Sequence, residues 1–423
     1  MDGAARGRLH FLSALRYPNY RYYWFGLMAT VFGQQVLIMS EGWLVYDLTH
    51  STALLGVTAA ANALPQLALT TFTGVVADRV DRRKLLMGTQ IAYGLVELAL
   101  ALLLATGQIS ASHIEQSMVL LVGAAALAGT VQAFDQPARM ALVPQLLDAR
   151  GEELLNAMAL QNMVWQTTAI VGPAVGGLLI AWVGVAACYF ITSASVLGMV
   201  FCLYRMRLFT EPAAARRQSV LHNIREGFGF IRGHTVISSL LAVIFFNALF
   251  GLSFQTMVPA FARDVLHTDA SGQGFMMGAF GFGALAGNLV LASAGRGEHA
   301  GKLVVWGGLG FGLALVAFAW SPWFGVSLGL LAALGILRAV YFTTASTSLQ
   351  ALVPNELRGR VMGVFGLTWS LMPLGGLLSG SVAAVTSPSF AVGMGGALVA
   401  LFALALMAKA PQVRTLSMVA PVP

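Results

Sequence analysis

Charged residues are scarce in this chain. Only 10% of its 423 residues are Asp, Glu, Lys or Arg, whereas 57% are hydrophobic. A soluble domain carries roughly 25% charged residues, so a chain this poor in charge could not cover a surface that faces water. The composition therefore excludes an ordinary soluble protein and indicates a membrane protein.

Cysteine is also rare, and histidine is never clustered. The two cysteines, Cys188 and Cys202, fall in one predicted helix, too far apart to bond to each other. The seven histidines show no metal-ligand spacing, and no phosphate-binding loop of the type G-x-x-x-x-G-K-S/T occurs. These absences argue against a metal site, ATP hydrolysis and enzymatic activity. We expect no cofactor, and an ion gradient as the source of energy.

Long apolar runs are what the sequence does contain. Twelve segments are apolar and close to the length of about 20 residues that a transmembrane helix needs. The segments cover residues 22–46, 52–77, 85–106, 117–138, 154–181, 184–206, 236–260, 272–294, 303–320, 322–346, 361–385 and 389–408. This pattern predicts an all-α membrane protein with twelve transmembrane helices.

The basic residues predict the orientation of these helices. If the N-terminus lies in the cytoplasm, 22 of the 24 Lys and Arg residues fall in cytoplasmic segments. Of the other two, Arg263 is in an outside loop and Arg338 is inside a span. The positive-inside rule therefore predicts a multi-pass protein with both termini cytoplasmic. The net charge of +7 reflects this topology, so we expect no nucleic-acid partner.

Two short sequences recur half a chain apart. ALVP occurs at 141–144 and at 351–354, after the fourth and the tenth span. GPAVGG at 172–177 in the fifth span is echoed by PLGG at 373–376 in the eleventh. The recurrence indicates a duplicated six-helix unit.

The longest cytoplasmic segment separates these two units. It contains apolar residues at helical spacing, which is typical of an amphipathic helix on a membrane surface. We therefore expect two pseudo-symmetric six-helix bundles, residues 1–206 and 236–423, joined by a linker at 207–235. Parallel repeats of this kind bind substrate at their interface and work by rocking.

The loop between the second and third spans carries the most specific motif, GVVADRVDRRKLL at residues 74–86. It resembles the G-x-x-x-D-R-x-G-R-R motif of the major facilitator superfamily, with Asp81 where that pattern has Gly. The matching residues are Gly74, Asp78, Arg79, Arg82 and Arg83. The resemblance extends over the whole chain and implies the major facilitator fold and a transporter that alternates between two open states.

The resemblance also implies a gating role for this loop. Asp78 would meet the start of the eleventh helix near Gly359, and Arg79 and Arg82 would pair with Asp135. Asp135 lies in the stretch FDQPAR, which ends at Arg139. These contacts would hold the cytoplasmic side shut. The alternative is that the arginines are ordinary positive-inside residues.

Three further stretches narrow the resemblance. LRYPNYRYYWFG at 15–26, WLVYDLTHS at 43–51 and FDQPARMALVPQL at 134–146 resemble the exporter branch that includes the enterobactin exporter and the macrolide efflux proteins. The branch implies proton-coupled export of a small hydrophobic or amphipathic molecule, drug-like or siderophore-like, by a monomer surrounded by lipid in a bacterial inner membrane. An importer, or a flippase for lipids or lysolipids, is the alternative on the same fold.

The fifth span adds a second signature. Its residues Gly172, Pro173, Gly176 and Gly177 resemble the antiporter motif of drug exporters. Proline removes a backbone donor and softens the helix, while the glycines permit close packing. The alternative is a kinked packing helix that has no bearing on the direction of transport.

Three charged residues lie inside predicted spans, where charge is costly and usually functional. Glu41 and Glu97 are candidates for proton coupling, although a hydrated carboxylate at Glu41 and a local hydrogen bond at Glu97 are alternatives. Arg338 could hold an anionic substrate or pair with an acid across the cavity. Other candidates for the substrate cavity are Gln34, Asn62, Gln66, Asn247, Gln255 and Trp369.

The gating hypothesis predicts the effect of Asp78→Asn. Removing the charge would weaken the contact with the positive N-terminal end of a helix and favour the inward-open state. We expect normal membrane insertion with reduced transport, measured on equal amounts of inserted protein. Unchanged transport would remove Asp78 from the gate.

Overall fold

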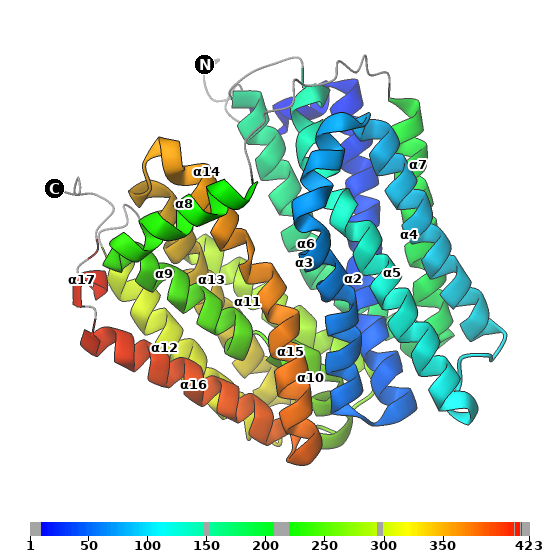
Figure 1. Cartoon of the computed structure of the whole chain (residues 1–423). Helices are drawn as coiled ribbons and strands as arrows, with labels where there is room; N and C mark the ends of the chain where they lie inside the picture. Colours follow the sequence, from blue (N-terminus) through cyan, green and yellow to red (C-terminus); the bar gives the residue numbers. More distant parts are fainter. Residues whose placement is uncertain are drawn as a thin grey trace, which may run out of the picture. The chain divides into compact units, whose positions relative to one another are not determined.

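A computed structural model describes residues 10–147, 152–206, 220–293, 299–409, 411–414 and 416. Every regular element in these residues is a helix (Figure 1). The long helices of the first half are α2 (Pro18–Thr49), α3 (Thr52–Arg79), α4 (Arg82–Ala105), α5 (Ile114–Leu142), α6 (Glu152–Val183) and α7 (Val185–Arg205). Short helices η1 (His10–Arg16), η2 (Ala111–His113) and η3 (Val143–Leu146) precede or join them.

The second half begins with α8 (Val220–Gly233), which lies in the predicted linker. It continues with α9 (Thr235–Phe246), η4 (Asn247–Gly251), α10 (Phe254–Ala260), η5 (Phe261–Val265), α11 (Ala270–Ser293), α12 (Ala300–Ala319), α13 (Phe324–Leu352), α14 (Asn355–Gly366), α15 (Thr368–Val385), α16 (Pro388–Lys409) and α17 (Pro411–Arg414). Two of these pieces, η4 and η5, are π-helical turns that interrupt the seventh span.

The helices confirm the twelve spans that the hydropathy predicts. Among the described residues, 11 helical segments are long and apolar enough to cross a membrane. Two of them join several elements, Thr235–Val265 from α9 to η5 and Asn355–Val385 from α14 to α15. The remaining span is α2, which has 32 residues but a more polar sequence that includes Gln34, Gln35 and Glu41.

The chain divides into two compact units. Unit 1 contains Met1–Leu44 and Ala61–Arg216, and unit 2 contains Val45–Ala60 and Arg217–Pro423. The second boundary falls within the predicted linker. The predicted N-terminal bundle, however, includes residues 45–60, which pack with unit 2. These residues are the end of α2 and the start of α3.

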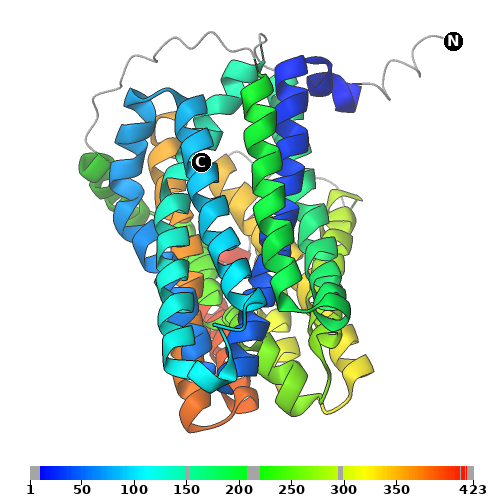
Figure 2. The same ribbon diagram turned by 90° about the vertical axis from the view of Figure 1, so that its right-hand side faces the viewer.

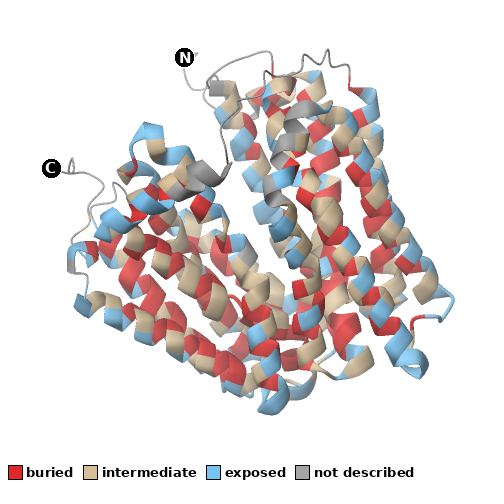
Figure 3. Ribbon diagram, in the orientation of Figure 1, coloured by how far each residue is buried: buried red, intermediate tan, exposed pale blue. Residues whose placement is uncertain are grey.

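Each unit has its own arrangement of packed helices. In unit 1, α4 packs on α5 and α7, and Figure 2 shows this blue-to-green set of helices from the side. In unit 2, α13 packs on α11 and α12, and α12 also packs on α16. Buried residues follow the faces where helices meet, and exposed residues occur both along the helices and in the connections (Figure 3).

The repeated double glycines make equivalent contacts in the two units. In α6, a Cβ added to Gly176 would lie 3.3 Å from the carbonyl oxygen of Val36 on α2, so the fifth span sits directly on the first. In α15, a Cβ added to Gly376 would lie 2.5 Å from Oγ1 of Thr256 on α10, so the eleventh span sits on the seventh. Small residues permit such close approach in membrane helices. The sequence echo therefore marks the same helix contact made twice.

The two ALVP copies also occupy equivalent places. The first two residues of each copy end a helix, since α5 ends at Leu142 and α13 ends at Leu352. The proline that follows cannot continue the helix with a backbone donor. It opens η3 in unit 1 and caps the start of α14 in unit 2.

Candidate functional site

The loop between α3 and α4 is organised by Asp81. This residue is the N-cap of α4, and its carboxylate accepts hydrogen bonds from the backbone N–H groups of Arg83 at 2.9 Å and Lys84 at 3.2 Å. An acidic N-cap satisfies free N–H groups and opposes the positive end of the helix dipole. The departure from the superfamily motif at this position therefore serves to start the third span.

The arginines of the loop bind helix ends. Arg82 Nη1 donates to the carbonyl oxygen of Ala141 at 3.2 Å, at the end of α5. Arg83 donates from Nε to the carbonyl oxygen of Leu203 at 2.7 Å and from Nη2 to the carbonyl oxygen of Tyr204 at 2.8 Å. Both carbonyls are at the end of α7. Carbonyls in the last turn of a helix lack the usual intrahelical partners, and the guanidinium groups supply donors to these three.

The predicted ion pair between Arg82 and Asp135 is wrong. Asp135 instead pairs with Arg139, one turn further along α5. The carboxylate also accepts from Thr89 Oγ1 at 3.1 Å and from Gln90 Nε2 at 2.6 Å, both on α4. Tyr23 lies beside the pair. A nearer arginine on the same helix therefore neutralises Asp135.

Some of the predicted gating residues stay untested. Gly74, Asp78 and Arg79 belong to α3, but their side chains lie outside the described residues, so the latch on Asp78 stays a prediction. Gly359 is exposed on α14, which begins at Asn355, six residues before the predicted start of the eleventh span.

The linker helix α8 binds the same segment of chain that contains Gly359. Glu226 forms an ion pair with Arg360, and Gly227 packs against the backbone of Arg360. The amphipathic pattern predicted the helix, but no sequence signal identified this partner.

Both candidate carboxylates belong to unit 1. Glu97 on α4 is only 3% exposed, accepts a hydrogen bond from Tyr93 and interacts electrostatically with Glu41 on α2. Tyr189 on α7 is buried and interacts with both glutamates. Within the described residues, Oε2 of Glu97 and the hydroxyl of Tyr189 have no hydrogen-bond partner. Glu97 is thus a buried carboxyl group with one unpaired oxygen, whereas Glu41 is half-buried on α2.

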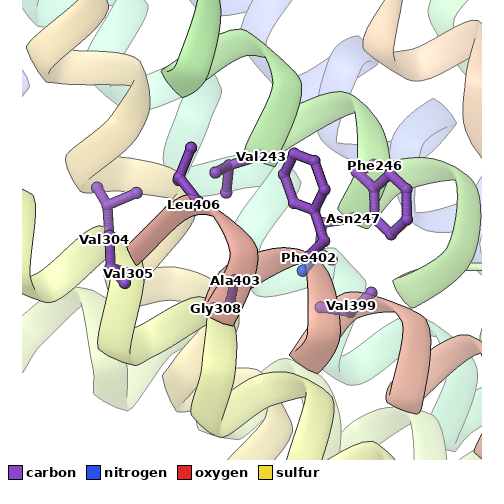
Figure 4. Close-up of a pocket in the computed structure, with 10 residues that line it drawn as sticks. All are labelled: Val243, Phe246, Asn247, Val304, Val305, Gly308, Val399, Phe402, Ala403 and Leu406. Atoms are coloured by element: carbon purple, nitrogen blue, oxygen red, sulfur yellow. The ribbon is translucent and has the colours of Figure 1, made fainter. Parts of the chain in front are cut away.

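The predicted polar cavity residues do not form one group. Asn62 donates to the carbonyl of Ala125 at 3.3 Å and so helps α3 pack on α5, while Gln66 donates to Asn62 at 2.8 Å one turn away on α3. Gln34 and Gln255 are half-buried. Asn247, at the start of the π-helical turn η4, lines a pocket between α9, α12 and α16 in the interior of unit 2 (Figure 4).

Arg338 and Trp369 both contact the ring of one phenylalanine, Phe342. The Arg338 guanidinium lies 5.5 Å from the ring centre of Phe342, whose own ring centre is 5.9 Å from that of Trp369. These residues come from α13 and α15 of unit 2.

A polar cluster that the sequence analysis missed joins α2 to η5 within unit 2. Asp47 forms an ion pair with Arg263, and the hydroxyl of Tyr46 donates to Asp264. One signal could have found it, because Arg263 is the only basic residue in a predicted outside loop. Among the described residues, no group of three or more His, Cys, Asp or Glu residues could hold a metal ion.

The buried pair in α5 predicts a large effect of Asp135→Asn. The substitution keeps an acceptor for Thr89 and Gln90 but leaves Arg139 buried without a counter-charge. Breaking such a pair costs about 3–5 kcal/mol. We expect a loss of that order in the free energy of unfolding of the purified protein in detergent. The double variant Asp135→Asn/Arg139→Gln should recover much of it, and a single variant as stable as the double would refute this account.

Comparison with known proteins identifies the family. Residues 10–421 match the major facilitator family described as transmembrane secretion effector. The multidrug efflux pump Tap of Mycolicibacterium fortuitum is 27% identical over 359 residues, covering 83% of this chain and 86% of its own. The enterobactin exporter EntS of Shigella boydii serotype 4 is 25% identical over 346 residues, covering 81% of this chain and 79% of its own.

Solved structures show the same fold at lower identity. The nucleoside transporter NupG superposes with a TM-score of 0.67 at 15% identity, covering 92% of this chain and 98% of its own. A bacterial homologue of the human lysosomal transporter Spinster, in an inward-facing and occupied conformation, superposes with a TM-score of 0.68 at 15% identity. The match covers 94% of this chain and 98% of the homologue. The chain therefore has the major facilitator fold, and it belongs to the transmembrane secretion effector family of major facilitator transporters.

Proposed function

We propose that the protein exports small hydrophobic or amphipathic molecules across a bacterial inner membrane, driven by protons. The match to a secretion effector family over nearly the whole chain carries the proposal. Relatives named as a multidrug efflux pump and an enterobactin exporter support export over import. In this proposal a monomer, with both termini in the cytoplasm, alternates between inward-open and outward-open states.

The carboxyl pair in unit 1 is the proposed proton site. Two carboxylates in one water-poor site repel each other, so Glu41 and Glu97 would hold at least one proton between them. Glu41 is on α2 and Glu97 is on α4, so a change in that proton alters how strongly the two helices attract. A proton and a substrate that favour different states would then drive exchange.

Uptake by inverted membrane vesicles tests the function. Vesicles that contain the protein would receive an imposed proton gradient and a panel of fluorescent lipophilic compounds. We expect accumulation that requires the gradient and collapses with an uncoupler. Vesicles with the Asp78→Asn variant and vesicles without the protein are the controls. If no compound accumulates above the protein-free vesicles, drug-like substrates are excluded.

The same assay tests the proton site. Glu41→Gln and Glu97→Gln each remove one ionisable group but preserve its size and hydrogen bonding. We expect both variants to lose the response of transport to the proton gradient while still moving compound down its own gradient. Glu115→Gln, an exposed glutamate at the start of α5, is the matched control. A normal dependence on pH in both variants would exclude the pair from coupling.

A further inference from the structure

Arg338 is a cation at the centre of a transmembrane helix. It lies 14 residues from either end of α13, which runs from Phe324 to Leu352. At about 1.5 Å per residue, each end of the helix is about 21 Å away. An arginine side chain cannot cover that distance to reach the membrane surface. The guanidinium therefore has to find its partners at the level of the membrane interior.

The partners that the described residues supply to Arg338 are aromatic rings. The guanidinium carbon lies 5.8 Å from the ring centre of Phe280 and 5.5 Å from that of Phe342. Within the part of the chain that the structure describes, Arg338 forms no ion pair, and its buried Nε donates no hydrogen bond. Cation–π contacts recover only part of what a charge loses on leaving water. Arg338 thus keeps donors in a fixed planar fork that suits an oxyanion.

The aromatic cluster continues away from the charge. Phe342 contacts Phe365 at 5.9 Å and Trp369 at 5.9 Å between ring centres. Trp369 is 54% exposed, whereas Phe280 is only 5% exposed. The guanidinium group therefore has a closed aromatic contact on α11 and an open aromatic surface on α14 and α15. A ligand that extends from Arg338 along this surface would place an anionic group on the cation and a flat apolar group on Phe342 and Trp369.

We propose that Arg338, Phe342 and Trp369 form the binding site for an organic anion that carries an aromatic group. The ligand class is an aromatic carboxylate, sulfonate or phenolate, held by charge-assisted hydrogen bonds to the guanidinium and by stacking on the rings. This inference rests on the proposed export of small amphipathic molecules and specifies which of them the protein prefers. It also gives the guanidinium a counter-charge, which no described residue provides by an ion pair.

Two dyes that differ in one charged group test the site. The probes are 8-anilino-1-naphthalenesulfonate and its neutral counterpart N-phenyl-1-naphthylamine. Both would be titrated into the purified full-length protein in nanodiscs, and binding to empty nanodiscs would be subtracted. The variants are Arg338→Gln and Arg338→Lys. Arg205→Gln is the matched control, because Arg205 also lies over a phenylalanine ring, that of Phe201, but is exposed at the end of α7.

We expect the unmodified protein to bind the sulfonate more tightly than the neutral dye. Arg338→Gln should weaken sulfonate binding at least about tenfold and leave the neutral dye unchanged, because hydrogen bonds to a charged group are lost. Arg338→Lys should fall between the two, since a lysine keeps the charge without the planar fork. Arg205→Gln should bind both dyes normally.

Three results would overturn the inference. The first is equal affinity of the unmodified protein for the two dyes. The second is sulfonate binding that Arg338→Gln leaves intact. The third is equal loss of both dyes in Arg338→Gln, which would mean that the arginine stabilises unit 2, for example by pairing with an acid of the protein itself. Because binding is measured without transport, failure of the vesicle assay would refute export and leave this site to be judged by its own titration.

Discussion

The bilayer offers no water to pair with polar groups, and the rest of this structure depends on that constraint. Backbone groups are satisfied by helices, and the free carbonyls at the ends of α5 and α7 are satisfied by Arg82 and Arg83. Polar side chains inside the units follow the same rule, as Asp135 shows by accepting from Thr89 and Gln90 while it neutralises Arg139. Several buried polar atoms of the described residues lack a partner, and two of them belong to ionisable groups on which the proposals rest. They are Oε2 of Glu97 in unit 1 and Nε of Arg338 in unit 2.

The duplication accounts for the packing that the two units share, whereas their polar groups differ. Both units use double glycines to bring the fifth helix of each half onto the first, so the packing of the scaffold is shared. The chemistry is not shared, because the paired carboxylates belong to unit 1 and the aromatic-bound arginine to unit 2. A duplicated scaffold with different polar groups in its two halves can respond to a proton in one half and to an organic anion in the other.

The sequence predicted what depends on local composition and missed what depends on helix rotation. Hydropathy predicted twelve spans because each span is a continuous run, and each ALVP copy marked a helix end because its proline removes a backbone donor where the apolar run stops. The partner of Asp135 was wrong because the motif suggested an arginine from another helix, whereas Arg139 lies one turn away. The approach of Glu97 to Glu41 could not be predicted, because it depends on which face α4 turns toward α2. The contact of α8 with Arg360 depends in the same way on tertiary packing.

Residues 45–60 have a consequence for how the protein is made. They are synthesised early, as the end of α2 and the start of α3, yet they pack with unit 2. A Cβ on Gly56 would lie 2.7 Å from the backbone of Leu377, and Thr52 donates to the carbonyl of Gly380, so their partners belong to the eleventh span. Residues 45–60 therefore lack these packing partners until the eleventh span has been synthesised. The first two spans and the eleventh complete this packing only together.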